Sequence, residues 1–562
     1  MEPRTWHPHY DDGVPTDFDF VERTLPAALE RAARERPAQD ALWFLDRRMS
    51  YRQLKDQVDR LATALAGLGV GKGTRVAIQL PNLPQTVIAY YAVVRLGAVV
   101  VMTSPLYTER EIAHQWRDAG CTVAIVTDFL WASRIRDMRE TLPIEHYVVA
   151  SLPEYMAFPK NLLAPARLKR ANPPMWAEVR SEPGVHRFRS LIRAARPAPP
   201  PLDVGMDDVA VLQYTGGTTG LAKGAVLTHR NLSSNAQGVA AWMHITDFAD
   251  EVVLAALPLF HVFGMTVTMN FAVWSACSMV LIPNPREFEA LMNTVARRKV
   301  TLFMGVPALF NGILKQPDAR TLDLSCVKSC FSGSAPLPVD VLERFEAMTG
   351  SRIVEGFGLS ETSPITHVNP LRKVRKVGSI GVPFVETDAR IVDLDTGTRT
   401  LPPGQDGELV VRGPQVMRGY WNQPEETAAI IRDGWLHTGD IAHMDEDGYF
   451  YISGRKKELI IVSGYNVYPD EVDGVLIAHP AVLESGTIGL PDRNSGERVK
   501  SFVVLRPGAT ATADELIAHC RENLAAFKVP RAIEFRAELP KSGALKVLRR
   551  VLRDQELAGA KA

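Results

Sequence analysis

The sequence predicts an α/β protein with a large N-terminal domain, built from several subdomains with mostly parallel sheets, and a small hinged α+β domain at the C-terminus. Short apolar runs alternate with helical patterns, as in 75–80, 83–97 and 98–103, and this alternation is typical of parallel sheets. The chain has 562 residues, too many for one hydrophobic core. Its composition changes near 454–473, where we expect the second domain to begin.

Further strands of the large domain are expected where apolar runs recur, at 121–127, 208–213, 301–306, 326–333 and 351–358. The stretch 252–285 contains no Asp, Glu, Lys or Arg, and its length raises the alternative of a transmembrane helix. It is interrupted by Pro258, His261, Gly264 and Asn270. A buried unit of strand, loop, helix and strand therefore fits it better, and its apolar wall around His261 suits a hydrophobic substrate.

The chain is predicted to divide into an N-terminal domain, 1–454, and a C-terminal domain, 455–562, with a hinge at 454–457. In the small domain, strands are expected at 484–490 and 500–506 and a helix at 512–527. Residues 159–201 are rich in Arg and Pro and end in a proline run, so we predict an irregular excursion there. Its basic residues are interpreted as a solvated loop in preference to a lipid-binding patch.

Composition restricts the class of function. Lys plus Arg and Asp plus Glu number 64 each, so the net charge does not indicate a nucleic-acid partner. Five scattered cysteines argue for a reducing compartment and against a disulfide framework. Residues 1–20 are acidic and lack the apolar core of a signal peptide. We therefore expect a cytoplasmic protein with small-molecule chemistry.

A phosphate-binding loop is predicted at 214–224, which reads YTGGTTGLAKG and follows the expected strand 208–213. Its glycines allow backbone amides to turn toward one point, and its threonines add hydroxyl donors. In the common nucleotide-binding loop a Ser or Thr follows the lysine and binds magnesium, whereas here Gly224 follows Lys223. The ligand for a phosphate-bound metal must therefore lie elsewhere in the chain.

A second glycine-rich turn offers that ligand. Residues 355–362 read EGFGLSET and place the carboxylate of Glu361 beside the hydroxyl of Ser360, which is a plausible magnesium site. The apolar face of Phe357 in the same turn is suited to stack on a purine ring. This turn is therefore a candidate for both the metal and the base of a nucleotide.

Two further turns complete a candidate ATP site. The small residues of 332–338 permit a flat ring to approach the backbone closely. Asp440 ends the segment 433–440, where a carboxylate can accept both hydroxyls of a ribose, and Arg455 lies just beyond. Each of these is a common structural turn when taken alone. In combination they describe an ATP site.

The motifs follow one another in a specific order, namely YTGGTTGLAKG, GFGLSET, YWNQPEET, DGWLHTGD, GRKKELIIVSGYNVYPDEVD and ELPKSGALKVLRR. Over most of its length the chain resembles the adenylate-forming superfamily of acyl-CoA synthetases, firefly luciferases and peptide-synthetase adenylation domains. Its SGYNVYPDEVD and LPKS segments are similar to those of bacterial long-chain fatty acid CoA ligases. The resemblance implies that carboxylate and ATP give an acyl-adenylate and pyrophosphate, after which a thiol, usually CoA, displaces AMP.

The resemblance also implies a role for individual residues of the chain. The implied catalytic residues are Lys546, Glu361, His261 and Lys223, with Glu361 as the ligand of Mg²⁺. The implied ATP site comprises Thr215, Gly216, Gly217, Thr218, Thr219, Gly220, Lys223, Gly333, Ser334, Ala335, Glu355, Gly356, Phe357, Gly358, Ser360, Asp440, Arg455 and Lys546. The CoA channel is implied at Gly464 and Tyr465, the hinge at Lys457, and the acyl pocket at Phe260, His261, Val262, Phe263, Gly305, Val306 and Pro307.

The role implied for Lys546 has a physical reason. Attack of a carboxylate on the α-phosphorus brings anions together, and losing one fixed donor at such a place costs about 10² to 10³ in rate. Most members of the superfamily have Gly before this lysine, whereas Leu545 stands here and restricts the backbone. After adenylation the small domain is expected to rotate about Lys457, which withdraws Lys546.

We therefore expect an ATP-dependent acid-thiol ligase that activates medium- to long-chain fatty acids and transfers them to CoA, with ATP, Mg²⁺ and CoA taking part. Two alternatives stay open. One is a fatty acyl-AMP ligase that loads a carrier protein. The other is a catalytically weakened acyl- or nucleotide-binding protein, an alternative that Leu545 before Lys546 suggests. A homodimer and a weak peripheral association with the inner face of a membrane are secondary expectations, and no nucleic acid is expected as a partner.

Overall fold

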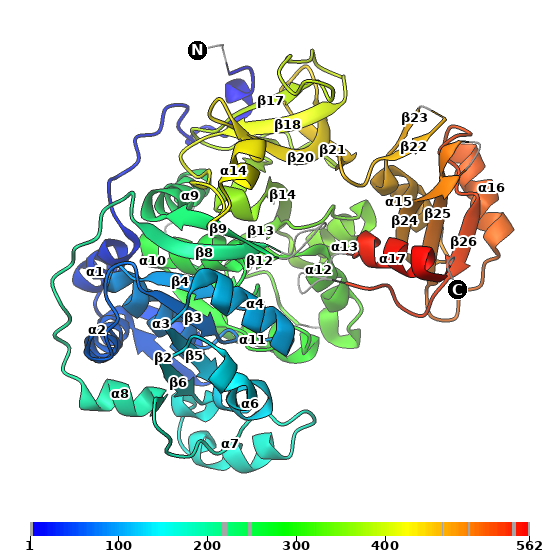
Figure 1. Ribbon diagram of the computed structural model, residues 1–562. Coiled ribbons are helices and arrows are strands. Elements are labelled where there is room, and N and C mark those ends of the chain that lie inside the picture. The colour runs from blue at the N-terminus through cyan, green and yellow to red at the C-terminus, as the bar shows by residue number, and fades with distance from the viewer. Residues whose placement is uncertain are drawn as a thin grey trace. The chain divides into compact units, whose positions relative to one another are not determined.

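The computed structural model describes residues 4–215, 222–244, 250–320, 322–463, 465–492, 495–541 and 547–559 (Figure 1). The chain forms two compact units. Unit 1 comprises 1–215, 222–387 and 412–431, and unit 2 comprises 216–221, 388–411 and 432–562.

One sheet of unit 1 has seven strands. Their order is β7 (Val185–Arg187), β6 (His146–Ala150), β5 (Val123–Thr127), β3 (Arg75–Gln79), β4 (Val99–Met102), β8 (Val209–Thr215) and β9 (Lys223–Thr228). All neighbours are parallel except β8 and β9, which form an antiparallel pair. Most of these strands are buried at nearly every position, which is why they read as continuous apolar runs.

A second sheet of unit 1 has nine strands. Their order is β16 (Val382–Pro383), β15 (Ile365–Val368), β14 (Arg352–Gly358), β13 (Ser329–Ser332), β12 (Leu302–Gly305), β10 (Val252–Ala255), β11 (Ser278–Leu281), β1 (Asp40–Phe44) and β2 (Arg47–Ser50). The strands from β14 to β1 are parallel, and antiparallel strands complete both edges. The predicted α/β class with mostly parallel sheets is confirmed.

Helices connect the parallel strands and cover the sheets (Figure 1). The α-helices of unit 1 are α1 (Leu25–Glu35), α2 (Tyr51–Gly67), α3 (Pro84–Arg95), α4 (Glu109–Ala119), α5 (Asp128–Leu130), α6 (Arg136–Met138), α7 (Lys160–Lys169), α8 (Phe188–Ala194), α9 (His229–Trp242), α10 (Phe271–Ser275), α11 (Phe288–Arg298), α12 (Pro307–Leu314), α13 (Val339–Thr349) and α14 (Pro424–Ile430). Every residue of α3 is buried, which explains why its sequence is apolar around the whole helix.

The uncharged stretch 252–285 folds as the sequence predicts. It forms β10, the π-helical turn η6 (Gly264–Asn270), α10 and β11, and β10 pairs with β11 in parallel. Within the part of the chain that the structure describes, no helix is both long enough and apolar enough to cross a membrane. The interpretation of this stretch as a buried core unit is confirmed.

The prediction of an irregular excursion at 159–201 is only partly correct, because 170–184 and 195–201 are irregular but the rest is not. The region contains α7, the edge strand β7 and α8. Phe188 and Ile192 lie four positions apart on α8 and are both buried, so this helix has the spacing of an amphipathic element. The many Arg and Pro residues obscured that short apolar pattern in the sequence.

Unit 2 contains two smaller sheets that are mostly antiparallel. One consists of β17 (Asp388–Val392), β18 (Gly407–Arg412), β19 (Ile431–Arg432), β20 (Trp435–Met444) and β21 (Phe450–Arg455). The other consists of β22 (Ile460–Val462), β23 (Tyr465–Val467), β24 (Val482–Asp492), β25 (Gly496–Leu505) and β26 (Ala532–Phe535). The helices of unit 2 are α15 (Pro469–Ala478), α16 (Ala513–Asn523) and α17 (Arg549–Gly559).

The strands and the helix that the sequence predicts in the small domain are present as β24, β25 and α16. Their buried faces share one apolar cluster, which includes Val467, Leu476, Val503 and Leu516. The small α+β region therefore has a core of its own, as expected. The exact boundary at 454/455 and the hinge at Lys457 stay predictions.

Candidate functional site

Three neighbouring parallel strands of unit 1 end at the predicted adenine and acyl residues. In the sheet register Gly305 lies opposite Ser332, and Ser332 lies opposite Glu355. A Cβ atom added to Gly333 would lie 3.1 Å from the ring of Phe263 and 3.3 Å from the carbonyl oxygen of Gly356. The residues predicted for the base and for the acyl group therefore adjoin. They lie at the carboxyl edge of the strands, where α/β proteins bind ligands.

The predicted adenine turn has a constrained backbone. Ser334 has a φ of 71°, in the left-handed region that non-glycine residues seldom adopt. The carboxylate of Glu355 accepts a hydrogen bond of 2.9 Å from the backbone N–H of Leu337, and burial raises the pKa of this carboxyl. Phe357 packs edge-on against His367 with ring centroids 6.2 Å apart. The Glu355 side chain thus holds the turn in shape.

His261 lies in a loop that a buried asparagine fixes. The side chain of Asn82 donates to the carbonyls of Ala255 and Leu257 at 2.9 and 2.8 Å and accepts from the N–H of Leu259 at 2.9 Å. The N–H of Phe263 donates to Nδ1 of His261 at 3.3 Å. Because Nδ1 accepts, a neutral His261 carries its proton on Nε2. Asn82 is a positioning residue that the sequence analysis missed.

Three further residues predicted for the acyl pocket, Gly305, Val306 and Pro307, lie at the start of α12. Val306 is the N-cap and Pro307 the first residue of this helix. A Cβ atom at Gly305 would lie 2.8 Å from the ring of Phe310, so the close packing of this ring requires a glycine. Phe260 contacts the other sheet, because its carbonyl accepts a hydrogen bond of 3.3 Å from the side chain of Gln213.

The phosphate side of the site is framed by β8 and β9, in which Thr215 pairs with Lys223. The ammonium of Lys223 lies 2.5 Å from a carboxylate oxygen of Glu426 and 5.4 Å from the centroid of the Tyr420 ring. The hydroxyl of Tyr420 donates to Oε1 of Glu361 at 2.7 Å. Tyr420 therefore connects the lysine predicted to bind phosphate with the carboxylate predicted to bind the metal.

The backbone on both sides holds Tyr420 in place. The N–H of Val226 donates to the carbonyl of Gly419 at 2.9 Å, and the N–H of Met417 donates to the carbonyl of Glu361 at 2.7 Å. Burial and the adjacent Glu361 carboxylate raise the pKa of Tyr420, so its hydroxyl stays a donor at neutral pH. Tyr420 begins the YWNQPEET motif, but no feature of that motif indicates its contact with a residue 59 positions away.

The residues present fit a magnesium ion that is bound together with a nucleotide. Oε1 of Glu361 accepts from Tyr420, and no other side chain of the described residues donates to this carboxylate. The described part of the chain also contains no cluster of three or more His, Cys, Asp or Glu that would enclose a metal. Magnesium in such sites takes one or two carboxylates and completes its shell with phosphate oxygens and water.

The predicted ribose residues meet in unit 2. Asp440 of β20 pairs in register with Arg455 of β21, and Nε of Arg455 lies 3.0 Å from the Asp440 carboxylate. Asp440 is almost fully buried, whereas the Arg455 side chain is partly exposed. The sequence prediction thus identified two residues that do lie together, although their contact with a ribose stays a prediction.

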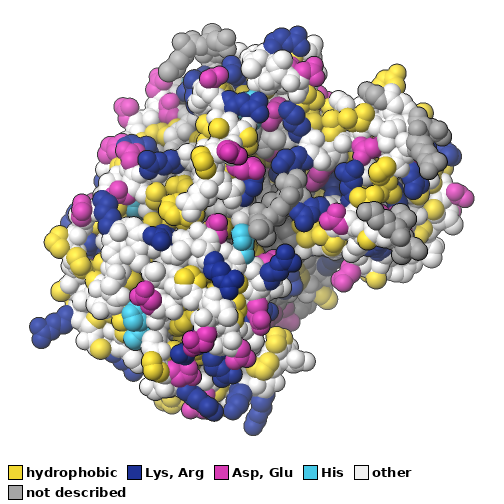
Figure 2. Space-filling view, in the orientation of Figure 1, with side chains coloured by type: hydrophobic (Ala, Val, Ile, Leu, Met, Phe, Trp, Pro, Cys, Tyr) yellow, Lys and Arg dark blue, Asp and Glu magenta, His cyan; other side chains and the backbone are white. Residues whose placement is uncertain are grey.

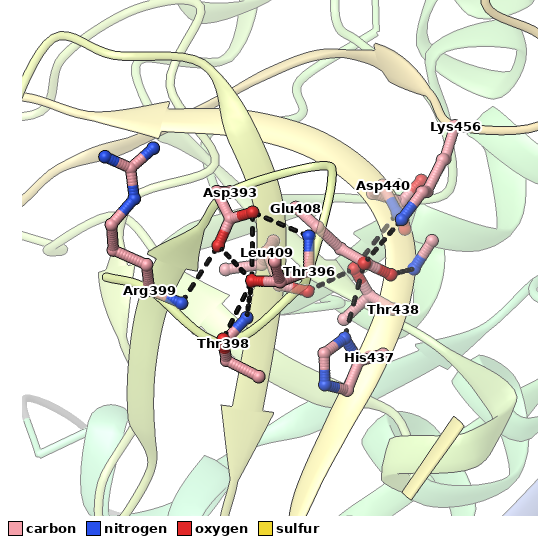
Figure 3. Close-up of polar contacts among 11 residues, drawn as sticks. Asp393, Thr396, Thr398, Arg399, Glu408, Leu409, His437, Thr438, Asp440 and Lys456 are labelled. Carbon is pink, nitrogen blue, oxygen red and sulfur yellow. Dashed lines mark hydrogen bonds and ion pairs between the residues drawn. The ribbon is translucent and has the colours of Figure 1, made fainter. Parts of the chain in front are cut away.

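A buried carboxylate supports the turn that precedes Asp440 (Figure 3). Glu408 accepts from the N–H of Gly439 at 3.2 Å, and it pairs with Lys456 at 3.2 Å and with His437 at 3.3 Å. Thr438 donates to the carbonyl of Leu409 at 2.7 Å and accepts from the N–H of Asp440 at 3.1 Å. Glu408 therefore links the turn before Asp440 to the segment that follows β21, a connection that the sequence did not indicate.

The roles predicted for a further group of residues stay predictions. Gly216, Gly217, Thr218, Thr219, Gly220, Gly464, Leu545 and Lys546 lie outside the described residues. Lys457 is exposed in a turn after β21. Tyr465 is exposed and stacks on Phe527 with ring centroids 4.7 Å apart, so an aromatic surface is present where the CoA channel is predicted.

Comparisons with known proteins agree with this arrangement. Residues 29–421 match the model of the AMP-binding enzyme family, and residues 471–546 match the AMP-binding enzyme C-terminal domain. A long-chain-fatty-acid CoA ligase of Bacillus subtilis is 43% identical over 98% of both chains. A feruloyl-CoA synthase of an Amycolatopsis species is 36% identical, covering 92% of this chain and 96% of the relative.

Two solved structures extend the likeness to three dimensions. The anthranilate CoA ligase AuaEII in complex with anthranoyl-AMP has a TM-score of 0.84 and is 30% identical, covering 96% of this chain and 99% of its own. The ATP-bound MatB of Rhodopseudomonas palustris has a TM-score of 0.83 at 30% identity, covering 95% and 99% of the two chains. The family model matches most of this chain, and relatives align with nearly all of it. The chain therefore belongs to the AMP-binding enzyme family.

Proposed function

We propose that the protein is an ATP-dependent, AMP-forming ligase that joins medium- to long-chain fatty acids to CoA. One observation carries this proposal. Gly333 of the predicted adenine site lies next to both Phe263 of the predicted acyl pocket and Gly356 of the second predicted adenine turn. An acid seated beside an adenylate can react at the α-phosphate without moving far. Relatives named long-chain-fatty-acid CoA ligases, at 35 to 43% identity, indicate the substrate class.

The reaction proceeds in two steps. A carboxylate oxygen attacks the α-phosphorus of ATP, the bond to the bridging oxygen of the β-phosphate breaks, and pyrophosphate leaves. The sulfur of CoA then attacks the acyl carbon, and AMP leaves with the bonding electrons. The first step brings anions together, so preorganised cations and hydrogen-bond donors supply most of the rate enhancement.

The residues of unit 1 are proposed to act on the triphosphate and the acid. Lys223 binds the β- and γ-phosphates, and His261 donates from Nε2 to the acyl carboxylate. Glu361 is the protein ligand of Mg²⁺, which neutralises phosphate charge when bound with ATP. Tyr420 is a positioning residue: its hydroxyl fixes Oε1 of Glu361, while its ring lies against the Lys223 ammonium.

Residues of unit 2 are proposed to hold the ribose and to complete the charge at the α-phosphate. Asp440 accepts the ribose hydroxyls, with Arg455 holding its carboxylate in place. Lys546 bridges the carboxylate and the α-phosphate during adenylation. Gly464 and Tyr465 border the path of CoA, and Lys457 is the hinge about which the C-terminal domain turns between the two steps.

Acid-dependent exchange of labelled pyrophosphate into ATP tests the first step. The purified protein is assayed with saturated acids of increasing chain length and with ferulate, because one relative is named for that aryl acid. Adding CoA then tests the second step through release of AMP and acyl-CoA. We expect exchange with fatty acids and thioester formation with CoA, and a Lys546→Ala variant is the reference for background exchange.

Two results would contradict the proposal. Product that forms only with a holo-carrier protein and not with CoA would assign the chain to the fatty acyl-AMP ligases. Exchange no higher than that of Lys546→Ala would indicate a weakened binding protein, in which Leu545 misplaces the lysine. A homodimer is proposed from the resemblance alone, and light scattering of the purified chain measures it.

A further inference from the structure

Helix α7 (Lys160–Lys169) is a peripheral element of unit 1 (Figure 1). It contains no buried residue. The turn before it, η4 (Leu152–Tyr155), is its anchor, because Leu152, Pro153 and Tyr155 are buried there and α7 packs against this turn. The fold therefore presents the outer face of α7 to its surroundings instead of using it in the core.

That face exposes large apolar side chains. Phe158, Leu162 and Leu163 are 79%, 67% and 68% exposed, and in the described part of the chain no other large apolar side chain is exposed as much. Single exposed apolar residues are ordinary in soluble proteins, but a contiguous group of them marks an interaction surface. The three most exposed ones lie within six consecutive positions of the sequence.

The same face is basic. Arg167, Lys169 and Arg170 are exposed, and no ion pair links them to an acidic side chain of the described residues. Leu163 lies four and seven positions before Arg167 and Arg170, so these side chains share one side of the helix. Residues 155–177 contain no Asp or Glu. Figure 2 shows Lys and Arg side chains projecting from the lower edge of the molecule, where α7 lies in Figure 1.

We propose that the outer face of α7, together with Phe158, docks on a membrane surface that contains anionic phospholipids. Phe158, Leu162 and Leu163 enter the boundary between headgroups and acyl chains, while Arg167, Lys169 and Arg170 contact the lipid phosphates. This reverses the interpretation of the region as a solvated loop. The link to fatty acid activation rests on the proposed function, because such acids partition into membranes, whereas the docking itself does not.

The charge of the face selects this occupant over a second copy of the chain. A symmetric dimer through α7 would bring two copies of the same positively charged face together, and like net charges on the two sides of an interface weaken it. An anionic lipid surface instead attracts them, and each cation near it contributes about a factor of five in affinity. An anionic lipid surface thus accommodates both the apolar and the basic side chains of this face.

Flotation of the full-length protein with lipid vesicles tests the proposal. Vesicles of phosphatidylcholine with about 30 mol% phosphatidylglycerol are compared with pure phosphatidylcholine at low and high salt. We expect binding to the anionic vesicles that salt weakens. The variant R167Q/K169Q/R170Q should bind them on the order of 100-fold more weakly, and Leu162→Ser with Leu163→Ser at least about tenfold more weakly.

A matched control removes two apolar side chains from other exposed positions of unit 1, Leu106→Ser with Val339→Ser, and should bind as the parent does. All variants should keep the parent melting temperature and the parent rate of AMP release with octanoate, which needs no membrane. A protein without ligase activity that still binds vesicles through α7 would contradict the proposed function and leave this inference intact.

Three results would overturn the inference. The first is that the parent chain fails to float with anionic vesicles. The second is that the α7 variants float as the parent does. The third is that the parent binds no vesicles and the Leu162→Ser, Leu163→Ser variant changes a dimer into a monomer. The last result would identify α7 as an interface between copies of this chain.

Discussion

The charged groups on the predicted phosphate side of unit 1 and around the predicted ribose turn of unit 2 differ in how many partners they have. In unit 1, Lys223 pairs with Glu426, whose side chain is about half exposed, and Glu361 receives one side-chain hydrogen bond among the described residues. In unit 2, the buried Glu408 pairs with Lys456 and His437 and also accepts from a backbone N–H. Lys223 and Glu361, which are predicted to bind a ligand, thus have few partners among the described residues. Glu408, which supports a turn, is buried and has several partners.

The largest effect is expected at Glu361, because it is the proposed protein ligand of the metal. Glu361→Gln keeps the shape and the hydrogen bond from Tyr420 but removes the charge. Pyrophosphate exchange should fall by about 10² to 10³ with little change in melting temperature, since Tyr420 is the only side chain among the described residues that bonds to this carboxylate. A variant that keeps more than about a tenth of the parent exchange rate would show that the metal ligand lies elsewhere.

Tyr420→Phe should have the next largest effect. It keeps the ring beside Lys223 and removes the hydroxyl that donates to Glu361, and a hydrogen bond to a charged group contributes about 1.5 to 3 kcal/mol. The Mg²⁺ concentration for half-maximal exchange should therefore rise about tenfold or more, while a saturating level restores the rate. Tyr451→Phe is the matched control, because that phenol also donates to a carboxylate, that of Asp445 at 3.2 Å, and neither residue belongs to the predicted site. An unchanged Mg²⁺ requirement would leave Tyr420 with a packing role only.

The stability of unit 1 should depend on pH through two buried histidines. Burial lowers the pKa of His229 to about 4 and that of His367 to about 3, whereas an unfolded histidine titrates near pH 6.5, roughly. The folded state keeps both neutral, so their contribution is complete above about pH 6.5 and is lost as the pH falls toward 4. Each should reduce the free energy of unfolding by up to about 1.4 kcal/mol per pH unit in that window.

Denaturant unfolding measured between roughly pH 7.5 and pH 5 checks this slope. His367→Gln removes one of the two groups, so its unfolding free energy should decline less steeply with acid than that of the parent. Equal slopes for the two proteins would mean that His367 does not stay neutral in the folded chain.

A smaller effect is expected at Glu408, which supports the turn before Asp440, the residue proposed to bind the ribose. Glu408→Gln keeps an acceptor for Gly439 but removes the charge that faces Lys456 and His437. We expect KM for ATP to rise about fivefold to tenfold and the preference for ATP over 3′-deoxy-ATP to shrink, with kcat nearly unchanged. Asp406→Asn removes a carboxylate paired with His443 on the same sheet and should leave that preference intact. If both variants behave alike, Glu408 has no specific role at the ribose.

The smallest effect belongs to Glu426, the partner of Lys223. An accessible ion pair of this kind contributes less than about 1 kcal/mol, and the ATP phosphates must replace it. Glu426→Gln should therefore lower the dissociation constant of ATP by less than about fivefold, most clearly at low salt. Weaker ATP binding in this variant would contradict the idea that Glu426 competes with the nucleotide for the lysine.

Local motifs made part of this site predictable. Glu361 and Ser360 share one glycine-rich turn, and Asp440 and Arg455 lie on neighbouring strands of one antiparallel pair. The α/β class, the family, and the activation of fatty acids with ATP, Mg²⁺ and CoA also followed from the sequence. These features depend on residues that are close in the chain or on a specific order of motifs, and both are visible without a fold.

The supporting residues were not predictable in the same way. Asn82 bonds to a loop 173 positions away, and nothing in its own neighbourhood indicates that loop. Tyr420 and Glu408 likewise act through contacts between segments that only the sheets bring together. The exposure of Leu162 and Leu163 was hidden as well, because a helical pattern does not show which face the core will cover.

The sequence by itself determined the alternation of strands and helices, the glycine-rich turns and which side chains are candidates for the reaction, since backbone preferences and side-chain chemistry are local properties. Only the tertiary structure decided which carboxylates are buried and paired, which lysine is left exchangeable, and which helix keeps its apolar face outside. Those properties depend on burial and on distances between segments far apart in the chain, and these exist only once the sheets have formed.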